Sequence, residues 1–274
     1  MEGLIESRAN PKIVETAKLS DRKYREREGV FCFEGSKLLA EAVSAGIPLK
    51  SVFCTEEAAG SFPDLIRSVS CPVFPVSSSV YEKLTFEKAP EGLFSVAKHL
   101  DNLIFSHTIY KKHSHLSAIM DRSRERFFLC EGIRDPGNAG TLIRTANALG
   151  IGRLVWSPDC ADPYHPRTVR AAMGALFRQR QEQTDDLPAY IRALRADGYP
   201  VYAAALREDA VSLRDLPDRA GAVFVVGNEG HGLSEETIAA CSGCVRIPMA
   251  EGAESLNVSS AASILMWESA GENR

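Results

Sequence analysis

Short apolar runs alternate with loops and helix-like segments from residue 127 onward. These runs predict strands at 127–131, 153–157, 200–205, 222–226 and 244–249. Segments with helical spacing follow four of them, at 139–150, 168–176, 234–240 and 256–269. Because strands that alternate with helices pair in parallel, the pattern predicts an α/β domain over residues 127–274, with a mostly parallel sheet flanked by helices.

A second, smaller group of elements precedes this domain. The pattern predicts helices at 11–20 and 36–45 and strands at 30–34, 51–55, 71–76 and 93–97. These elements indicate a small α/β domain over residues 1–98. Residues 99–126 are largely polar and include a charged run, which predicts a linker between the two domains.

The composition is typical of a globular protein, with 45% hydrophobic and 25% charged residues. No apolar run approaches the roughly 18 residues of a membrane helix. The first residues also lack the basic-then-apolar pattern of a signal peptide. We therefore expect a cytoplasmic protein that does not contact a membrane.

Cysteine and histidine positions do not indicate a metal site. The cysteines are odd in number and lie mostly among apolar neighbours, which is typical of reduced, buried thiols, at Cys32, Cys54, Cys71, Cys130, Cys160, Cys241 and Cys244. Cys241 and Cys244 have C-x-x-C spacing, but no second pair or histidine completes a zinc set. His107, His113 and His115 lie in the predicted linker, where we expect them to be solvated. No metal is therefore predicted.

Charge is distributed unevenly along the chain. The formal net charge is −4, yet residues 8–37 carry eight basic and five acidic residues, a local charge of +3. Residues 127–274 carry 14 basic and 19 acidic residues, a charge of −5. A basic surface on an acidic protein is compatible with specific RNA contacts, because phosphate binding needs Lys and Arg only at the contact surface. A solvated helix with mixed charges explains the same residues.

Three loops rich in glycine and polar residues follow predicted strands, at 131–140, 227–233 and 247–257. Ligands of parallel sheets bind at the carboxyl ends of strands, and glycines let the backbone approach them. A nucleotide-type cofactor is therefore expected. The order of Gly227, Gly230 and Gly232 is G-x-x-G-x-G rather than the dinucleotide-binding G-x-G-x-x-G, and no P-loop sequence follows.

The polar residues of these loops have structural as well as functional interpretations. Helix capping explains Asn138, Ser255 and Asn257, whose side-chain oxygens lie beside predicted helix starts. Arg144 is suited to extend into solvent or to contact phosphate and a developing oxyanion. Glu229 is suited to bond loop amides or to act in the site.

Three motifs occur in order along the second half of the chain. They are D-P-G-N-A-G-T-L-I-R-T-A-N-A-L-G-I, F-V-V-G-N-E-G-H-G-L and R-I-P-M-A-E-G-A-E-S-L-N-V-S, which begin at residues 135, 224 and 246. Together they resemble the motifs of the SpoU/TrmH family of SPOUT RNA methyltransferases. Residues 1–98, with N-P-K-I-V-E and F-E-G-S-K-L-L-A-E-A, are similar over a shorter stretch to the ribosomal-protein-like substrate-binding domain of that family.

The resemblance implies transfer of a methyl group from S-adenosylmethionine to a ribose 2′-hydroxyl of ribosomal RNA, with transfer RNA as the alternative. It also implies a C-terminal trefoil knot that holds the cofactor, and a homodimer formed through the knotted domain. The implied cofactor site comprises Gly227, Asn228, Gly232, Ile247, Met249 and Leu256. The implied active site comprises the catalytic Arg144, in its own subunit or across the dimer, with Asn138, Glu229, Ser255 and Asn257.

Physical chemistry limits these roles. A guanidinium is always protonated near neutral pH, so we expect Arg144 to contact phosphate and the oxyanion rather than to act as a base. A sulfonium cofactor needs no phosphate cradle, which agrees with glycine-rich loops that differ from a P-loop. The acidic charge of residues 127–274 leaves a non-catalytic RNA-binding or assembly protein as an alternative, against which Arg144, Glu229 and Asn257 weigh.

Overall fold

The structure is a computed structural model of the 274-residue chain. It describes residues 3–106, 125–217 and 219–270. Much of the predicted linker, with His107, His113 and His115, therefore lies outside the described residues. Within those residues, no helix is long and apolar enough to span a membrane.

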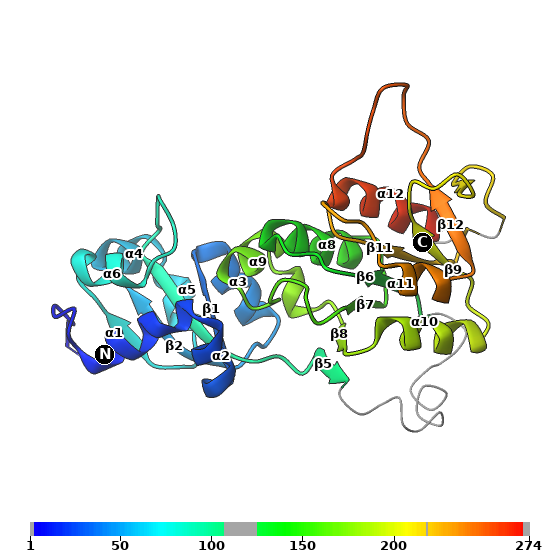
Figure 1. Ribbon diagram of the computed structural model, residues 1–274. Helices are drawn as coiled ribbons and strands as arrows, with labels where there is room; N and C mark the ends of the chain where they lie inside the picture. The colour runs from blue at the N-terminus through cyan, green and yellow to red at the C-terminus, as the bar shows by residue number, and fades with distance from the viewer. Residues whose placement is uncertain (1–2, 107–124, 218, 271–274) are drawn as a thin grey trace. The chain divides into compact units, whose positions relative to one another are not determined.

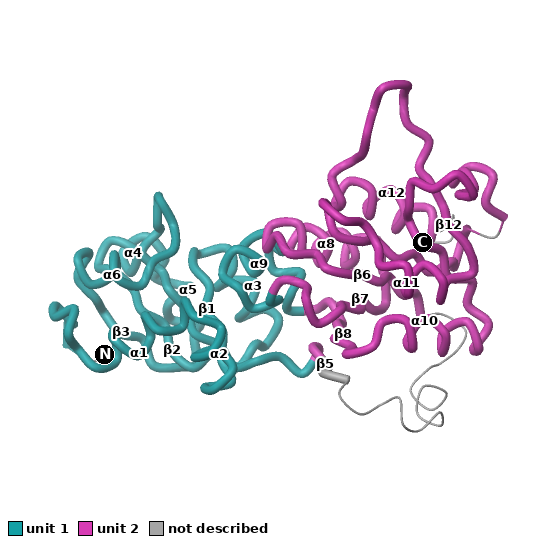
Figure 2. Tube along the Cα trace, viewed as in Figure 1, with its two compact units in different colours: residues 1–101, 162–177 teal, residues 102–161, 178–274 magenta. Residues whose placement is uncertain are grey.

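The chain forms two compact units (Figure 2). Unit 1 consists of residues 1–101 and 162–177, and unit 2 consists of residues 102–161 and 178–274. The segment 162–177 follows a strand of unit 2 in the sequence, yet it packs within unit 1. The boundaries of the compact units therefore differ from the predicted domain boundaries at this segment.

Unit 1 is built on a small sheet whose strands are β1 (Val30–Glu34), β2 (Leu49–Cys54), β3 (Val73–Pro75) and β4 (Leu93–Lys98). Their order is β1-β4-β2-β3, with β4 antiparallel to β1 and β2, and β2 parallel to β3. The helices are α1 (Pro11–Ala17), α2 (Arg22–Glu28), α3 (Ser36–Ser44), α4 (Glu56–Ser61), α5 (Pro63–Ser68), α6 (Ser78–Leu84) and α9 (Pro166–Ala172), with 3₁₀ turns at Lys18–Ser20 and Ala175–Phe177. The helices and strands predicted before residue 98 are confirmed.

A buried ion pair fixes the segment 162–177 within unit 1. The guanidinium of Arg25, which is 2% exposed, donates to Asp162 Oδ2 at 2.6 Å. It also donates to the carbonyl oxygens of Leu19 and Ser20 at 2.7 and 2.8 Å. A charge pair removed from water is stable only when such additional bonds satisfy it. The inserted segment is thus held by a contact across 137 positions of sequence.

Unit 2 contains an eight-stranded sheet of order β10-β12-β9-β11-β6-β7-β8-β5. Its strands are β5 (Leu103–Ser106), β6 (Phe127–Cys130), β7 (Arg153–Trp156), β8 (Gln181–Thr184), β9 (Val201–Ala204), β10 (Val211–Ser212), β11 (Val223–Val226) and β12 (Gly243–Arg246). All of these neighbours pair in parallel, which confirms the predicted sheet. The helices are α8 (Pro136–Ala148), α10 (Leu187–Ala196), α11 (Glu235–Ala240) and α12 (Val258–Ala270).

Helices cover both faces of this sheet. In Figure 1, α8 and α12 lie on one face, and α10 and α11 lie on the other. Phe127, Leu129 and Val225 belong to the core beneath α10, to which Tyr190 and Ile191 contribute from the helix. Strands buried on both faces need apolar residues at consecutive positions, so β6 and β11 are continuous apolar runs.

Four elements of unit 2, namely β5, β8, β10 and α10, have no counterpart among the predicted elements. β8 is polar in sequence, yet Gln181, Glu182 and Thr184 are at most 3% exposed. Glu182 Oε2 accepts hydrogen bonds from Arg153 at 2.9 Å and from Tyr190 at 3.2 Å, which satisfies the buried carboxylate. β5 pairs with β8 although it lies at the start of the predicted linker. These strands depend on partners that no local pattern identifies.

Candidate active site

Three loops leave the sheet of unit 2 at the carboxyl ends of β6, β11 and β12, and they comprise residues 131–135, 227–234 and 247–257. β6 and β11 are adjacent, and β12 is separated from β11 by β9 alone. Because all four strands run in parallel, the loops emerge at one edge. The sequence prediction that the three loops share an edge is confirmed.

The loop after β11 closes on itself. Asn228 N donates to the carbonyl oxygen of Gly232 at 3.0 Å, and Gly232 N donates back to that of Asn228 at 2.9 Å. The Asn228 side chain donates to Gly132 O at 2.7 Å and accepts from Gly230 N at 2.8 Å. A Cβ at Gly227 would lie 2.4 Å from the carbonyl carbon and oxygen of Gly232. The closed loop therefore requires glycine at 227.

Glu131 fixes the far end of this loop. Its carboxylate accepts from Ser234 N at 2.9 Å, from Ser234 Oγ at 2.8 Å and from Thr237 Oγ1 at 2.8 Å. Ser234 is the N-cap of α11, so the first two loops are joined at a helix start. Glu131 was not among the predicted site residues, although a carboxylate directly after a buried strand is a usable signal.

Asn138 joins all three loops. Its Nδ2 donates to Glu229 Oε1 at 2.5 Å, and its Oδ1 accepts from Ser259 Oγ at 3.0 Å and from Asn257 Nδ2 at 3.3 Å. The predicted residues Asn138, Glu229 and Asn257 thus lie together. With Ser259 they form a group that we call the Asn138 cluster. Ser259 was not predicted, because its hydroxyl lies within a helix of small residues that resembles ordinary packing.

Helix capping at this edge differs in part from the sequence-based interpretation. The N-cap of α8 is Asp135, whose Oδ1 accepts from Asn138 N at 2.9 Å, so Asn138 lies inside the helix and does not cap it. Capping by Asn257 is present, since its Oδ1 accepts from Ser259 N at 2.9 Å at the start of α12. Ser255 is exposed in the preceding loop. The Asn138 side chain is therefore available for the cluster.

Arg144 lies apart from the Asn138 cluster. It is exposed on α8, and the described residues form no recorded hydrogen bond or ion pair with its side chain. Six residues of helix separate it from Asn138 by about 9 Å along the axis and about 120° around it. Its guanidinium is therefore accessible to a ligand.

The third loop, residues 247–257, projects from the sheet edge between β12 and α12 (Figure 1). Ile247 and Met249 are half-buried, whereas Leu256 is 40% exposed. This loop lies beside the Asn138 cluster, because Asn257 belongs to both. It therefore offers exposed backbone and apolar side chains to a ligand near the cluster.

The cluster and its surroundings favour binding of a polar organic ligand. Glu229 supplies a carboxylate, Asn138 and Asn257 supply amides, and Ser259 supplies a hydroxyl. The part of the chain that the structure describes contains no group of three or more His, Cys, Asp or Glu suited to a metal ion. Burial raises the pKa of Cys241 to about 12, so this C-x-x-C thiol is protonated at neutral pH and is a poor nucleophile.

Comparison with known families identifies the family of the chain. The chain belongs to the SpoU rRNA Methylase family, whose model matches residues 125–267 and thus all three loops. Residues 10–95 match a second model, the MRM3-like substrate binding domain. The two models match the predicted catalytic and N-terminal regions in the predicted order.

Individual relatives extend over nearly the whole chain. The 23S rRNA (guanosine(2553)-2′-O)-methyltransferase RlmP of Bacillus subtilis is 29% identical, over 97% of this chain and 99% of that protein. An rRNA methyltransferase from Sinorhizobium meliloti, solved with bound AdoMet (S-adenosylmethionine), superposes with a TM-score of 0.80 at 27% identity, covering 97% of each chain. The AdoMet complex of AviRb from Streptomyces viridochromogenes gives 0.79 at 26% identity, covering 95% of this chain and 97% of that one.

We expect Gly227→Ala to destabilise unit 2, because the new methyl group would overlap the backbone of Gly232. Such overpacking costs about 2 kcal/mol and lowers Tm by about 4–8 °C in scanning calorimetry. Gly230→Ala is the matched control, since its Cβ would meet only Asn228 Oδ1 at 3.4 Å. Equal melting temperatures of the two variants would contradict the close approach at Gly227.

Proposed function

We propose that this protein transfers a methyl group from S-adenosylmethionine to a ribose 2′-hydroxyl of ribosomal RNA. The observation that carries the proposal is the Asn138 cluster, which joins the three loops of the family match at one sheet edge. RlmP and a 23S rRNA (uridine(2479)-2′-O)-methyltransferase of Streptomyces viridochromogenes, both named for this reaction, support it at 29% and 28% identity. These names favour ribosomal over transfer RNA.

The residues present fit S-adenosylmethionine, which would supply a methyl group activated by a sulfonium. The closed backbone of the second loop, with Gly227, Asn228 and Gly232, would bind it through main-chain groups. Apolar contacts would come from the third loop, through the half-buried Ile247 and Met249 and the exposed Leu256. Residues 224–233 and 246–259 contain one basic residue between them, so the site lacks a phosphate cradle, as a sulfonium cofactor allows.

Substrate binding would fall to the polar residues at the same edge. A ribose hydroxyl is a weak nucleophile near neutral pH, so it must be held in line and its developing negative charge stabilised. Asn138, Glu229 and Asn257 would orient the hydroxyl by hydrogen bonds, together with Ser255 from the third loop. Arg144, which lies apart from these residues, would contact phosphate and stabilise the oxyanion as a permanent cation, in its own subunit or across the proposed dimer.

We further propose that residues 1–98 bind the RNA, that residues 99–126 act mainly as a linker, and that residues 127–274 form the catalytic domain. The match of residues 10–95 to a substrate binding domain supports the first assignment. The contrast between a basic segment at 8–37 and an acidic catalytic region also supports it. The similarity to the bacterial RlmP favours a cytoplasmic location.

A C-terminal trefoil knot and a homodimer complete the proposal. After β12 the chain returns to the first loop, where α12 packs on α8 and Ser259 bonds to Asn138. α12 also exposes Ile264 by 38% and Trp267 by 53%. Large exposed apolar side chains on one helix favour association, so we propose that two copies pair through α12.

Methyl transfer is tested by incubating the protein with S-adenosylmethionine labelled in its methyl group and with total RNA. Digestion to nucleosides should place the label on ribose oxygen, in ribosomal RNA. Labelled bases, label confined to transfer RNA, or no transfer to any RNA would each contradict the proposal.

Replacement of the proposed oxyanion contact should slow the chemical step. We expect Arg144→Ala to lower kcat about 100- to 1000-fold, because one charge-stabilising donor is lost. The affinity for S-adenosylmethionine, measured by calorimetry, should stay at the wild-type value. Arg192→Ala on α10 removes an exposed arginine from the other face of the sheet and should retain full activity. Unchanged turnover in Arg144→Ala would remove the residue from the mechanism.

A charge on the exposed face of α12 should prevent pairing. Trp267→Glu places a carboxylate where the proposed interface buries an apolar ring, so we expect sedimentation analysis to show a monomer. Leu206→Glu, at a side chain that is 63% exposed elsewhere in unit 2, is the control and should remain dimeric. A monomeric wild-type protein, or a dimeric Trp267→Glu variant, would exclude this interface.

A further inference from the structure

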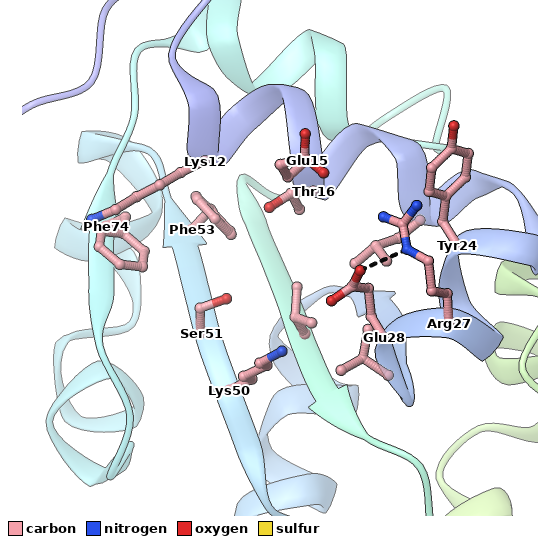
Figure 3. Close-up of a pocket in the computed structure, with 13 residues that line it drawn as sticks. Lys12, Glu15, Thr16, Tyr24, Arg27, Glu28, Lys50, Ser51, Phe53 and Phe74 are labelled. Carbon is pink, nitrogen blue, oxygen red and sulfur yellow. Dashed lines mark hydrogen bonds and ion pairs between the residues drawn. The ribbon is translucent and has the colours of Figure 1, made fainter.

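A cavity of about 330 Å³ opens in unit 1 between the segment α1–α2 and the strands of the small sheet (Figure 3). Its floor is apolar, since Leu19, Val30, Phe53 and Val96 line it and are each at most 5% exposed. Ligand pockets range from about 300 to 1000 Å³, so this volume suits a small planar group rather than a helix or a strand. None of its residues belongs to the Asn138 cluster.

Cations lie over aromatic rings at both ends of the cavity. Lys12 Nζ is 4.1 Å from the centroid of the Phe74 ring, and the guanidinium carbon of Arg27 is 4.8 Å from that of Tyr24. Figure 3 shows the Lys12 pair at one end and the Arg27 pair at the other, with Lys50 on β2 between them. Aromatic rings and guanidinium planes are the surfaces on which unpaired bases stack.

Positive charge exceeds negative charge around the cavity. Both carboxylates that line it are paired with cations, Glu15 with Lys18 at 2.6 Å and Glu28 with Arg27 at 2.9 Å. Lys50 is exposed, and no ion pair is recorded for it within the described residues. A flexible ammonium group at the cavity mouth is suited to a phosphate, which it contacts as a point charge.

Hydrogen-bonding groups are available between the floor and the cations. Thr16 on α1 and Ser51 on β2 line the cavity, and the described residues form no recorded hydrogen bond with either side-chain hydroxyl. A hydroxyl both donates and accepts, so it can bond to the edge of any base. The cavity thus combines an apolar floor, stacking planes, hydroxyls and cations.

We propose that this cavity binds one unpaired nucleotide of a single-stranded segment of the RNA substrate. The base lies against the apolar floor with its edge at Thr16 and Ser51, and the flanking phosphates meet Lys12 and Lys50. Bases within a duplex are stacked and paired, so the cavity selects single-stranded RNA. The inference rests on the proposed function and deepens it by naming the form of RNA that unit 1 recognises.

Filling the cavity tests this inference without changing charge. Ser51→Phe should raise the Kd for a fluorescein-labelled single-stranded RNA of about 12 nucleotides at least about tenfold, because the base is excluded and its stacking is lost. The Kd for S-adenosylmethionine and the melting temperature report whether the variant is folded. Binding of the same RNA annealed as a duplex should change little.

Removal of the Lys50 ammonium group tests the phosphate contact. Lys50 is exposed, so its replacement should not affect folding. Lys50→Ala should reduce the slope of log Kd against log salt concentration by about 0.7 for the single-stranded RNA. Lys37→Ala on α3 is the matched control, because Lys37 is exposed in the same unit and does not line the cavity. Its salt slope should equal that of the wild type.

The inference would be overturned if folded Ser51→Phe bound single-stranded RNA with wild-type affinity. It would also be overturned if Lys37→Ala and Lys50→Ala reduced the slope of log Kd against log salt concentration equally. A third contradicting result would be that the cavity binds an apolar peptide in place of RNA and that Ser51→Phe blocks this binding. Methyl transfer separates this failure from that of the proposed function. If the wild type methylates ribose and Ser51→Phe has the same KM for RNA, only the cavity inference fails. If the wild type binds RNA through Lys50 without methylating it, only the proposed function fails.

Discussion

The side-chain amide of Asn138 is the contact on which the candidate site depends. Its donor binds Glu229 and its acceptor binds Asn257 and Ser259, so one residue holds loops from three parts of the sequence. Its partners lie 91 to 121 residues from it along the chain. An isolated loop of glycines and small polar residues has many conformations, and ordering it costs about 1–2 kcal/mol per residue. Shared hydrogen bonds at the sheet edge offset part of this cost.

The sheet supplies the geometry that makes this contact possible. Parallel pairing of β11 with β6 brings residues after Val226 beside residues after Cys130. Glu131 then secures the start of α11, and the close approach at Gly227 shapes the loop between them. The apolar strands therefore do more than form a core, because their common direction decides which polar residues meet.

Much of this arrangement is predictable from sequence, because continuous apolar runs and glycine-rich loops are local signals. The parallel sheet and its loops follow from them, whereas the grouping of Asn138, Glu229 and Asn257 is implied by the resemblance to the SpoU/TrmH family. β8 is not predictable in this way, since its buried Glu182 is stabilised by Arg153 from another strand. The insertion of residues 162–177 into unit 1 likewise depends on a distant buried ion pair. The sequence predicts Asn138 as a cap, whereas the cap of α8 is Asp135, because the helix begins at Pro136.

In the proposed function, the two units divide the chemistry between them. Unit 2 carries the exposed loops and the polar cluster, whereas unit 1 carries the cation-rimmed cavity for which RNA binding is proposed. An acidic catalytic region can serve an anionic substrate if affinity comes from elsewhere in the chain, because phosphate attraction acts at the contact surface.

The proposed function requires that the three loops around Asn138 form the S-adenosylmethionine site. This requirement can be tested by hydrogen exchange of the full-length protein with and without S-adenosylmethionine. We expect slower exchange at backbone amides of residues 227–233 and 247–257, with little change in unit 1. Protection confined to other segments, or no protection at saturating S-adenosylmethionine, would contradict it.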